Sequence, residues 1–229
     1  MNRPPLILRW HDLPRRAIDA TTRRPVSTFV AQAPCDSGQP AVQPFDFGVA
    51  IQRMVMDIAI RCAEFRHLQA PRILVSVTQA RGSHVHGLQA RVTPLRFANG
   101  ALVRKRGGVP YHIQRLFLRE HEYLYVMTFC LPRYLEQSFD QKVVTLFHEL
   151  YHISPAFDGD LRRHEGRYHV HSKSKRGYDE LMVEHAREYL AGKPDPNLFA
   201  FLRMDFAQLQ ERHGAVVGVV VPRPKMIPI

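Results

Sequence analysis

The sequence of 229 residues lacks long apolar runs and has few cysteines and few acidic residues. No uninterrupted apolar stretch approaches the roughly 18–20 residues that a membrane-spanning helix needs. The first residues carry only a three-residue apolar run, at 6–8, before polar and basic residues return. Such a run is too short for a secretory signal. The sequence therefore predicts a protein with no membrane partner.

The three cysteines, Cys35, Cys62 and Cys130, lie far apart and form no CxxC pair. This pattern argues against a disulfide framework and against a cysteine-rich zinc ribbon, and it favours a reducing, cytoplasmic location. Cys62 and Cys130 fall within apolar patterns and are predicted to be small buried side chains.

Acidic residues number 21 against 32 Lys and Arg, which gives a formal charge of +11, and there are 13 His. With 45% hydrophobic and 23% charged residues, the composition is that of a globular protein rather than a disordered chain. The basic residues gather in clusters such as Arg104-Lys105-Arg106 and Arg162-Arg163. These clusters suggest nucleic acid as a partner, although aromatic residues do not interleave them.

The chain divides into an irregular basic arm at 1–44 and one domain of mixed α and β structure at 45–229. Asp46 opens a helix whose apolar residues recur every three or four positions as far as residue 65, and strands are expected at 72–78, 88–95 and 101–103. Residues 116–118 and 123–129 read as two arms of a hairpin or as one strand with a bulge. Ser138 and Gln141 form a capping box for a helix that ends near residue 153. Asp179 is expected to cap a helix to about residue 190, followed by a helix at 197–213 and a strand at 216–221.

The second of these helices carries the motif His148-Glu149-Leu150-Tyr151-His152. Residues four apart on a helix are separated by about 400° of rotation, so both imidazoles emerge on one face, one turn apart. Two neutral imidazoles in this arrangement can bind one Zn²⁺. Glu149, offset by about 100°, is placed to act on water as a general base.

A catalytic zinc site needs a third protein ligand, and the loop after the motif offers several. Five of the 13 His lie between positions 148 and 171. His164 is the first candidate, because Pro155 ends the helix and Gly159 can turn the chain back. His169, His171 and Asp158 are alternatives from the same loop, and Glu184 is the alternative if the site is built on two helices. His84 and His86, one residue apart, lack an evident third ligand.

The segment 144–164 resembles zinc metallopeptidases of the zincin group that are predicted in phage and prokaryotic genomes. The resemblance rests on the HELYH motif, on Phe157-x-Gly159 and on residues 161–164, Leu-Arg-Arg-His. The site is also similar to that of SprT-like proteases, in which a His followed closely by Gly and an aromatic residue supplies the third ligand. His164-Glu165-Gly166-Arg167-Tyr168 matches that pattern with one extra residue before the glycine.

The resemblance implies an α+β, minimal zincin-like fold, with a small mixed β-sheet packed on an active-site helix and further helices. It also implies an edge strand that pairs with an extended peptide substrate, for which 123–129 is the candidate. The implied activity is zinc-dependent hydrolysis of peptide bonds, with His148, His152 and His164 as ligands, Glu149 as general base and Tyr168 as a candidate oxyanion stabiliser. The alternative is a nucleic-acid-associated basic protein whose metal is structural, or a DNA-associated SprT-like protease.

Overall fold

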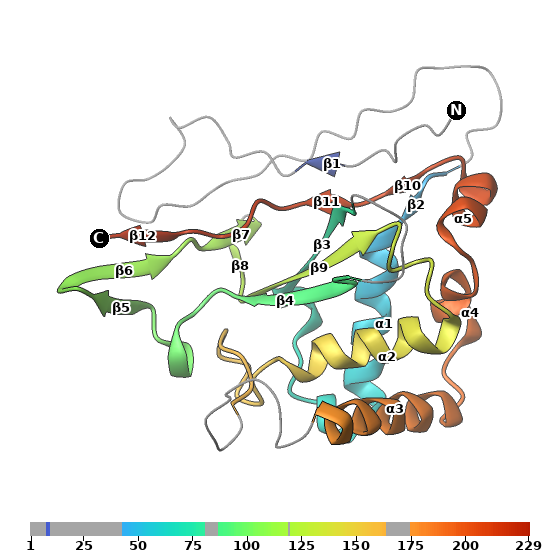
Figure 1. Cartoon of the computed structure of the whole chain (residues 1–229), viewed down its shortest axis with the longest axis horizontal. Helices are drawn as coiled ribbons and strands as arrows, with labels where there is room; N and C mark the ends of the chain where they lie inside the picture. The colour runs from blue at the N-terminus through green and yellow to red at the C-terminus, as the bar shows by residue number, and fades with distance from the viewer. Residues whose placement is uncertain (1–7, 10–42, 81–86, 119, 164–174) are drawn as a thin grey trace.

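The computed structural model describes residues 8–9, 43–80, 87–118, 120–163 and 175–229 (Figure 1). The arm expected at 1–44 therefore lies almost wholly outside the described residues. The helices are α1 Phe47–Arg61, α2 Phe139–Tyr151, α3 Lys175–Ala191, α4 Pro196–Phe199 and α5 Phe206–His213. The strands are β1 Leu8–Arg9, β2 Phe45–Asp46, β3 Ile73–Gln79, β4 Ala90–Pro94, β5 Val103–Arg106, β6 Val109–Ile113, β7 Leu116–Leu118, β8 His121–Tyr123, β9 Tyr125–Leu131, β10 Val216–Val217, β11 Val219–Val220 and β12 Met226–Pro228. None of the described helices has the length and apolarity to cross a membrane.

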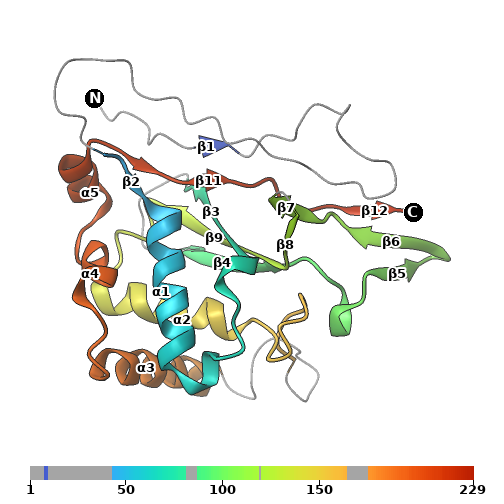
Figure 2. The same cartoon turned by 180° about the vertical axis from the view of Figure 1, so that it is seen from behind.

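The central sheet is mixed and has the order β3-β9-β4, with β3 parallel and β4 antiparallel to β9. Both views show α1, α2 and α3 on the same side of this sheet (Figures 1 and 2). A mixed sheet packed on helices confirms the predicted α+β class. The expectation that 123–129 forms an edge strand was wrong, because β9 is the middle strand and all seven of its residues are buried. A continuous apolar run is what a strand buried on both faces requires, and the edge belongs to β4.

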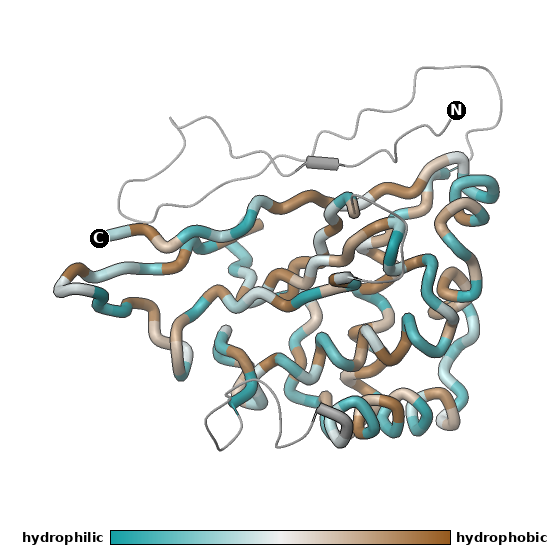
Figure 3. Tube along the Cα trace, in the orientation of Figure 1, coloured by the Kyte–Doolittle hydropathy of each residue, from teal (hydrophilic) through white to brown (hydrophobic). Residues whose placement is uncertain are grey.

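Side chains alternate between two cores along the strands, as the period of two in a strand dictates. Val75 and Met127 face the main core, which α1 and α2 complete. Leu74 and Val126 face a smaller core on the opposite side, shared with Leu116. The brown, apolar stretches of the trace follow these strands and the inner sides of the helices (Figure 3). The sheet is therefore covered on both faces, and α2 is fixed against one of them.

Helices α1 and α2 begin where the sequence predicts. The Asp46 carboxylate accepts the Val49 N–H at 2.9 Å. At α2, the Ser138 hydroxyl accepts the Gln141 N–H at 3.3 Å, and the Gln141 side chain accepts the Ser138 N–H at 3.2 Å. The capping box therefore closes the helix that carries the histidine motif.

The last third of the chain is more broken than expected. Helix α3 begins at Lys175 rather than after Asp179. The single helix expected at 197–213 is divided into α4, a short 3₁₀ segment and α5, because Asp205 and Gln208 form a second capping box that starts a new helix. The strand expected at 216–221 is interrupted at Gly218, where a Cβ atom would lie 2.8 Å from the Val77 side chain.

Two hairpins lie beyond the central sheet. The strand expected at 116–118 is β7, and it pairs with β8 rather than with 123–129. The strand expected at 101–103 lies further along the chain as β5, which pairs with β6. Strand β12 joins the other edge of β6, so β12, β6 and β5 form a separate three-stranded sheet that extends away from the helices (Figure 1).

The two described cysteines are free thiols. Cys130 is buried as predicted, whereas Cys62 is only partly buried. Partial burial still raises the pKa of the Cys62 thiol to about 11. Cys35 lies outside the described residues.

Candidate metal centre

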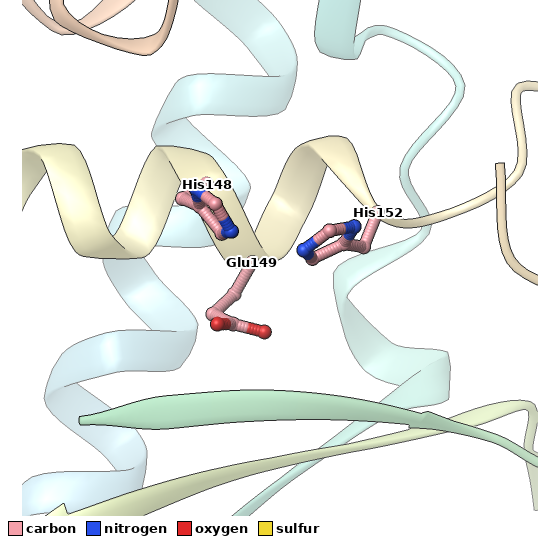
Figure 4. Close-up of side chains that lie close together, drawn as sticks. All are labelled: His148, Glu149 and His152. Carbon is pink, nitrogen blue, oxygen red and sulfur yellow. The ribbon is translucent and has the colours of Figure 1, made fainter. Parts of the chain in front are cut away.

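The two motif histidines lie side by side at the C-terminal end of α2. His148 is in the last helical turn, and His152 is the capping residue, still with helical backbone angles. Their ring centroids are 4.7 Å apart and the ring planes are inclined at 78°. Figure 4 shows both imidazoles on one side of the helix. This is the geometry predicted from the four-residue spacing.

Glu149 completes a group that could hold a metal ion. One ligand atom from each of His148, Glu149 and His152 lies within 4.8 Å of the others. Both histidines are half-buried, so their rings are held by the protein but reachable from solvent. Two imidazole nitrogens and a carboxylate are a donor set that transition-metal ions such as Zn²⁺ accept. The residues present therefore fit a metal site.

The Glu149 carboxylate points toward the edge strand β4 (Figure 4). Its side chain is only 7% exposed. Burial raises the pKa of Glu149 to about 7, against the opposing effect of a hydrogen bond from the backbone of Val92. Because Arg91 pairs with Thr128 of β9 and its neighbours alternate, the Val92 amide points away from β9. A carboxylate that changes protonation near neutral pH thus lies at the outer edge of the sheet.

No family model, no curated protein and no solved structure matches the chain. The chemistry of the site therefore rests on its own residues.

Helix α3 presents an aromatic residue to the histidines. The Tyr178 ring is stacked on His152 at 5.8 Å between centroids and meets His148 edge-on at 4.9 Å. Its hydroxyl donates a long hydrogen bond, 3.5 Å, to the His148 carbonyl oxygen. Tyr178 is buried, and burial raises the pKa of its phenol. It therefore restricts the orientation of both imidazoles.

Neither of the described alternatives for a third ligand joins the histidine pair. Glu184 is exposed and is not a member of the metal-binding group found among the described residues. Six residues correspond to about 600° of helical rotation, so Glu184 points away from the side that Tyr178 presents. The Asp158 carboxylate accepts the Asp160 N–H at 3.1 Å within its own loop. The remaining candidates, His164, His169 and His171, lie outside the described residues, as do Tyr168, His84 and His86.

The loop after α2 folds back on the helix end. Ile153 pairs with Leu161 in an antiparallel bridge, and the Arg162 N–H donates to the His152 carbonyl oxygen at 2.7 Å. The Arg162 Nε also donates to the Tyr151 carbonyl oxygen at 2.9 Å, and its guanidinium lies 3.9 Å from the centre of the Tyr151 ring. Arg162 thus satisfies two carbonyl groups that a helix end leaves without partners, and it holds the turn from which His152 projects.

A tyrosine of the central strand anchors the same loop. The Tyr125 hydroxyl accepts the Gly159 N–H and donates to the Asp160 carbonyl oxygen, both at 2.9 Å. The Asp160 carboxylate in turn accepts the Asn99 N–H at 3.0 Å and pairs with Arg163 at 2.8 Å. These bonds connect the loop to β9 and to the turn before β5. The loop is therefore a fixed part of the structure up to Arg163.

The supporting residues Val92, Tyr178, Arg162 and Tyr125 do not emerge from the sequence. Arg162 stands out there only as part of a basic cluster, and Tyr125 only as part of an apolar strand. The Val92 amide leaves no trace in the identity of its side chain. Tyr178 lies in the expected 154–177 loop's shadow, one position beyond it, where the four-residue spacing to Met182 was the available signal for an earlier helix start.

Proposed function

We propose that this chain is a zinc-dependent peptidase that hydrolyses peptide bonds, with Glu149 as the general base. The observation that carries the proposal is the placement of two adjacent imidazoles and a buried carboxylate at the outer edge of a sheet. A buried carboxylate with a raised pKa beside candidate metal ligands is typical of a catalytic site.

Zinc is the metal that this donor set favours. Neutral imidazoles suit Zn²⁺, and a catalytic zinc keeps one coordination position for water or substrate besides three protein ligands. His148 and His152 supply two ligands, and His164 stays the proposed third. Bound there, Zn²⁺ would lower the pKa of a coordinated water toward about 7 and polarise the scissile carbonyl.

The protein's own residues then handle the proton. Glu149, poised near neutral pH by burial, accepts the proton of the attacking water and passes it to the leaving amine. The Val92 amide holds one face of the carboxylate, which fixes its direction. Tyr178 and Arg162 keep the two histidines and the helix end in place while the charge changes. Tyr168 stays a proposal for oxyanion stabilisation.

Strand β4 takes the substrate-pairing role that was expected of 123–129. Among the described residues, β4 pairs on one side only, with β9. The Val92 amide on its other side meets Glu149. An extended peptide added along this edge would bring its backbone to the general base, and main-chain hydrogen bonds would supply affinity.

The test compares Glu149→Gln with wild type after both are loaded with one equivalent of Zn²⁺. The assay measures cleavage of an unfolded, fluorescently quenched protein substrate, with bound zinc determined on the same samples. We expect Glu149→Gln to keep zinc and to lose about 10²–10⁴-fold in rate, the usual contribution of a general base. Glu184→Gln makes the same chemical change at an exposed position of α3 and should leave the rate unchanged.

Two further outcomes decide the proposal. His148→Ala should lose stoichiometric zinc and activity together. Activity that survives Glu149→Gln at unchanged zinc content would remove Glu149 from the chemistry. Zinc held by four protein ligands, without hydrolysis by the wild type, would favour a structural metal instead.

A further inference from the structure

The sheet formed by β12, β6 and β5 extends away from the helical layer and bears little of the protein's core (Figures 1 and 2). All residues from 101 to 109 are exposed. The turn between β5 and β6 is Gly107-Gly108, and both glycines have positive φ, as a tight two-residue hairpin turn requires. The hairpin is therefore a projecting ribbon with a compact tip.

The ribbon is basic because its part of the chain contains no acid. Between Glu64 and Glu120 there are 55 residues without Asp or Glu but with ten Arg or Lys, and the chain after Glu211 has no acid either. Arg96 and Arg115 are neutralised, since both pair with Glu122. Arg104, Lys105 and Arg106 have no ion pair with any residue in the described ranges, and all three are exposed. Three uncompensated charges thus stand next to one another on β5.

Strand pairing gives this charge an aromatic companion that the linear sequence hides. Arg104 lies directly opposite Tyr111 on β6, and Arg106 lies opposite Val109. Residues paired in this way, and residues two apart on a strand, share one face of a sheet. One face therefore presents Arg104, Arg106 and Tyr111 together, with the two arginines separated by about 6.6 Å along the strand.

We propose that this face binds single-stranded nucleic acid. Guanidinium groups contact phosphates in a bidentate manner, and a tyrosine ring accepts a stacked base of any sequence. Exposed apolar side chains at Val103, Val109 and Met226 suit the flat faces of unpaired bases. An anionic membrane is a poorer fit, because the projecting tip consists of two glycines and has no side chain to insert. This surface goes beyond the proposed peptidase chemistry and does not depend on it.

The test measures binding of a fluorescently labelled, mixed-sequence single strand about 20 nucleotides long, by anisotropy, over a range of salt concentrations. The full-length protein carries Arg104→Ala, Lys105→Ala and Arg106→Ala together. We expect an affinity loss of about tenfold or more at about 0.1 M salt. The slope of log K against log salt should fall by about 2, since each lost phosphate contact removes about 0.7. The matched control removes three exposed arginines elsewhere: Arg53, Arg66 and Arg212.

A second pair of variants tests the aromatic contact. Tyr111→Ala should weaken binding about fivefold or more, whereas Tyr111→Phe should retain it, because stacking needs the ring and not the hydroxyl. Equal losses in the hairpin triple and the control triple would overturn the assignment, because net charge alone would then explain binding. Tighter binding to duplex than to single strand, or binding to anionic phospholipid vesicles without binding to the oligonucleotide, would overturn it as well.

Discussion

Replacing Tyr125 by Phe removes a single oxygen atom that serves two hydrogen bonds. The ring stays buried in its contact with Phe157, at 5.1 Å between centroids, so packing is preserved. The Gly159 N–H loses its acceptor, and the Asp160 carbonyl oxygen loses the tyrosine hydroxyl. That carbonyl still accepts the Ser154 N–H at 3.2 Å. The variant therefore leaves one buried donor unsatisfied and removes one further bond.

These two losses set the expected cost. A buried donor without a partner costs about 1–3 kcal/mol, and an ordinary hydrogen bond contributes about 1 kcal/mol. We expect Tyr125→Phe to lower the free energy of unfolding by about 2–4 kcal/mol, with an unchanged dependence on urea concentration. The measurement is urea unfolding of metal-free protein, followed by tryptophan-independent far-UV circular dichroism.

Tyr111→Phe is the matched control, because it removes the same atom from a half-buried ring on the β5–β6 hairpin. Its free energy of unfolding should change by no more than about 0.5 kcal/mol, as for substitutions that disturb no buried group. A loss below about 0.5 kcal/mol for Tyr125→Phe would refute the view that this hydroxyl anchors the loop.

Two other predictions concern the metal centre. In metal-free protein, Glu149 has a pKa of about 7 when folded against an ordinary value of 4.5, so its contribution to stability is complete below about pH 4.5 and is lost as the pH rises through 7. Unfolding free energies of wild type relative to Glu149→Gln should therefore fall by about 2–3 kcal/mol between about pH 5 and pH 8, and identical pH profiles would contradict the burial of this charge. Arg162→Lys keeps the charge but loses the planar contact with Tyr151 and the Nε bond to its carbonyl oxygen, so competition titrations should show weaker zinc binding and unfolding should show a loss of about 1–2 kcal/mol. Arg187→Lys, at an exposed position of α3, is the control, and an equal effect there would remove Arg162 from the support of the site.

Local signals in the sequence were enough to predict the helix that carries the candidate site. The Ser138–Gln141 capping box and the four-residue spacing of the histidines act within one helix, so they need no knowledge of the rest of the fold. The same kind of signal, Asp205 with Gln208, was present before α5 and marks the break that the expected 197–213 helix missed.

Features that depend on pairing between distant segments could not be derived in this way. The choice between an edge and a central position for β9 depends on which strands flank it, although its unbroken apolar run favoured the centre. The contact between the Val92 backbone and Glu149 joins residues 57 positions apart through main-chain atoms, which no residue type encodes. The meeting of Arg104 with Tyr111 likewise depends on the hairpin register.

The bonds of Arg162 and the contacts of Tyr178 have a consequence for how this region can vary. The chain passes His152 at Arg162 and returns to both histidines at Tyr178, so the two points that enclose residues 164–174 are held independently of that segment. Doubling the length of a loop between fixed ends costs only about 0.6 kcal/mol. Insertions between these two points should therefore leave the histidine pair intact, which makes the segment a place where specificity can diversify while the metal-binding helix is unchanged.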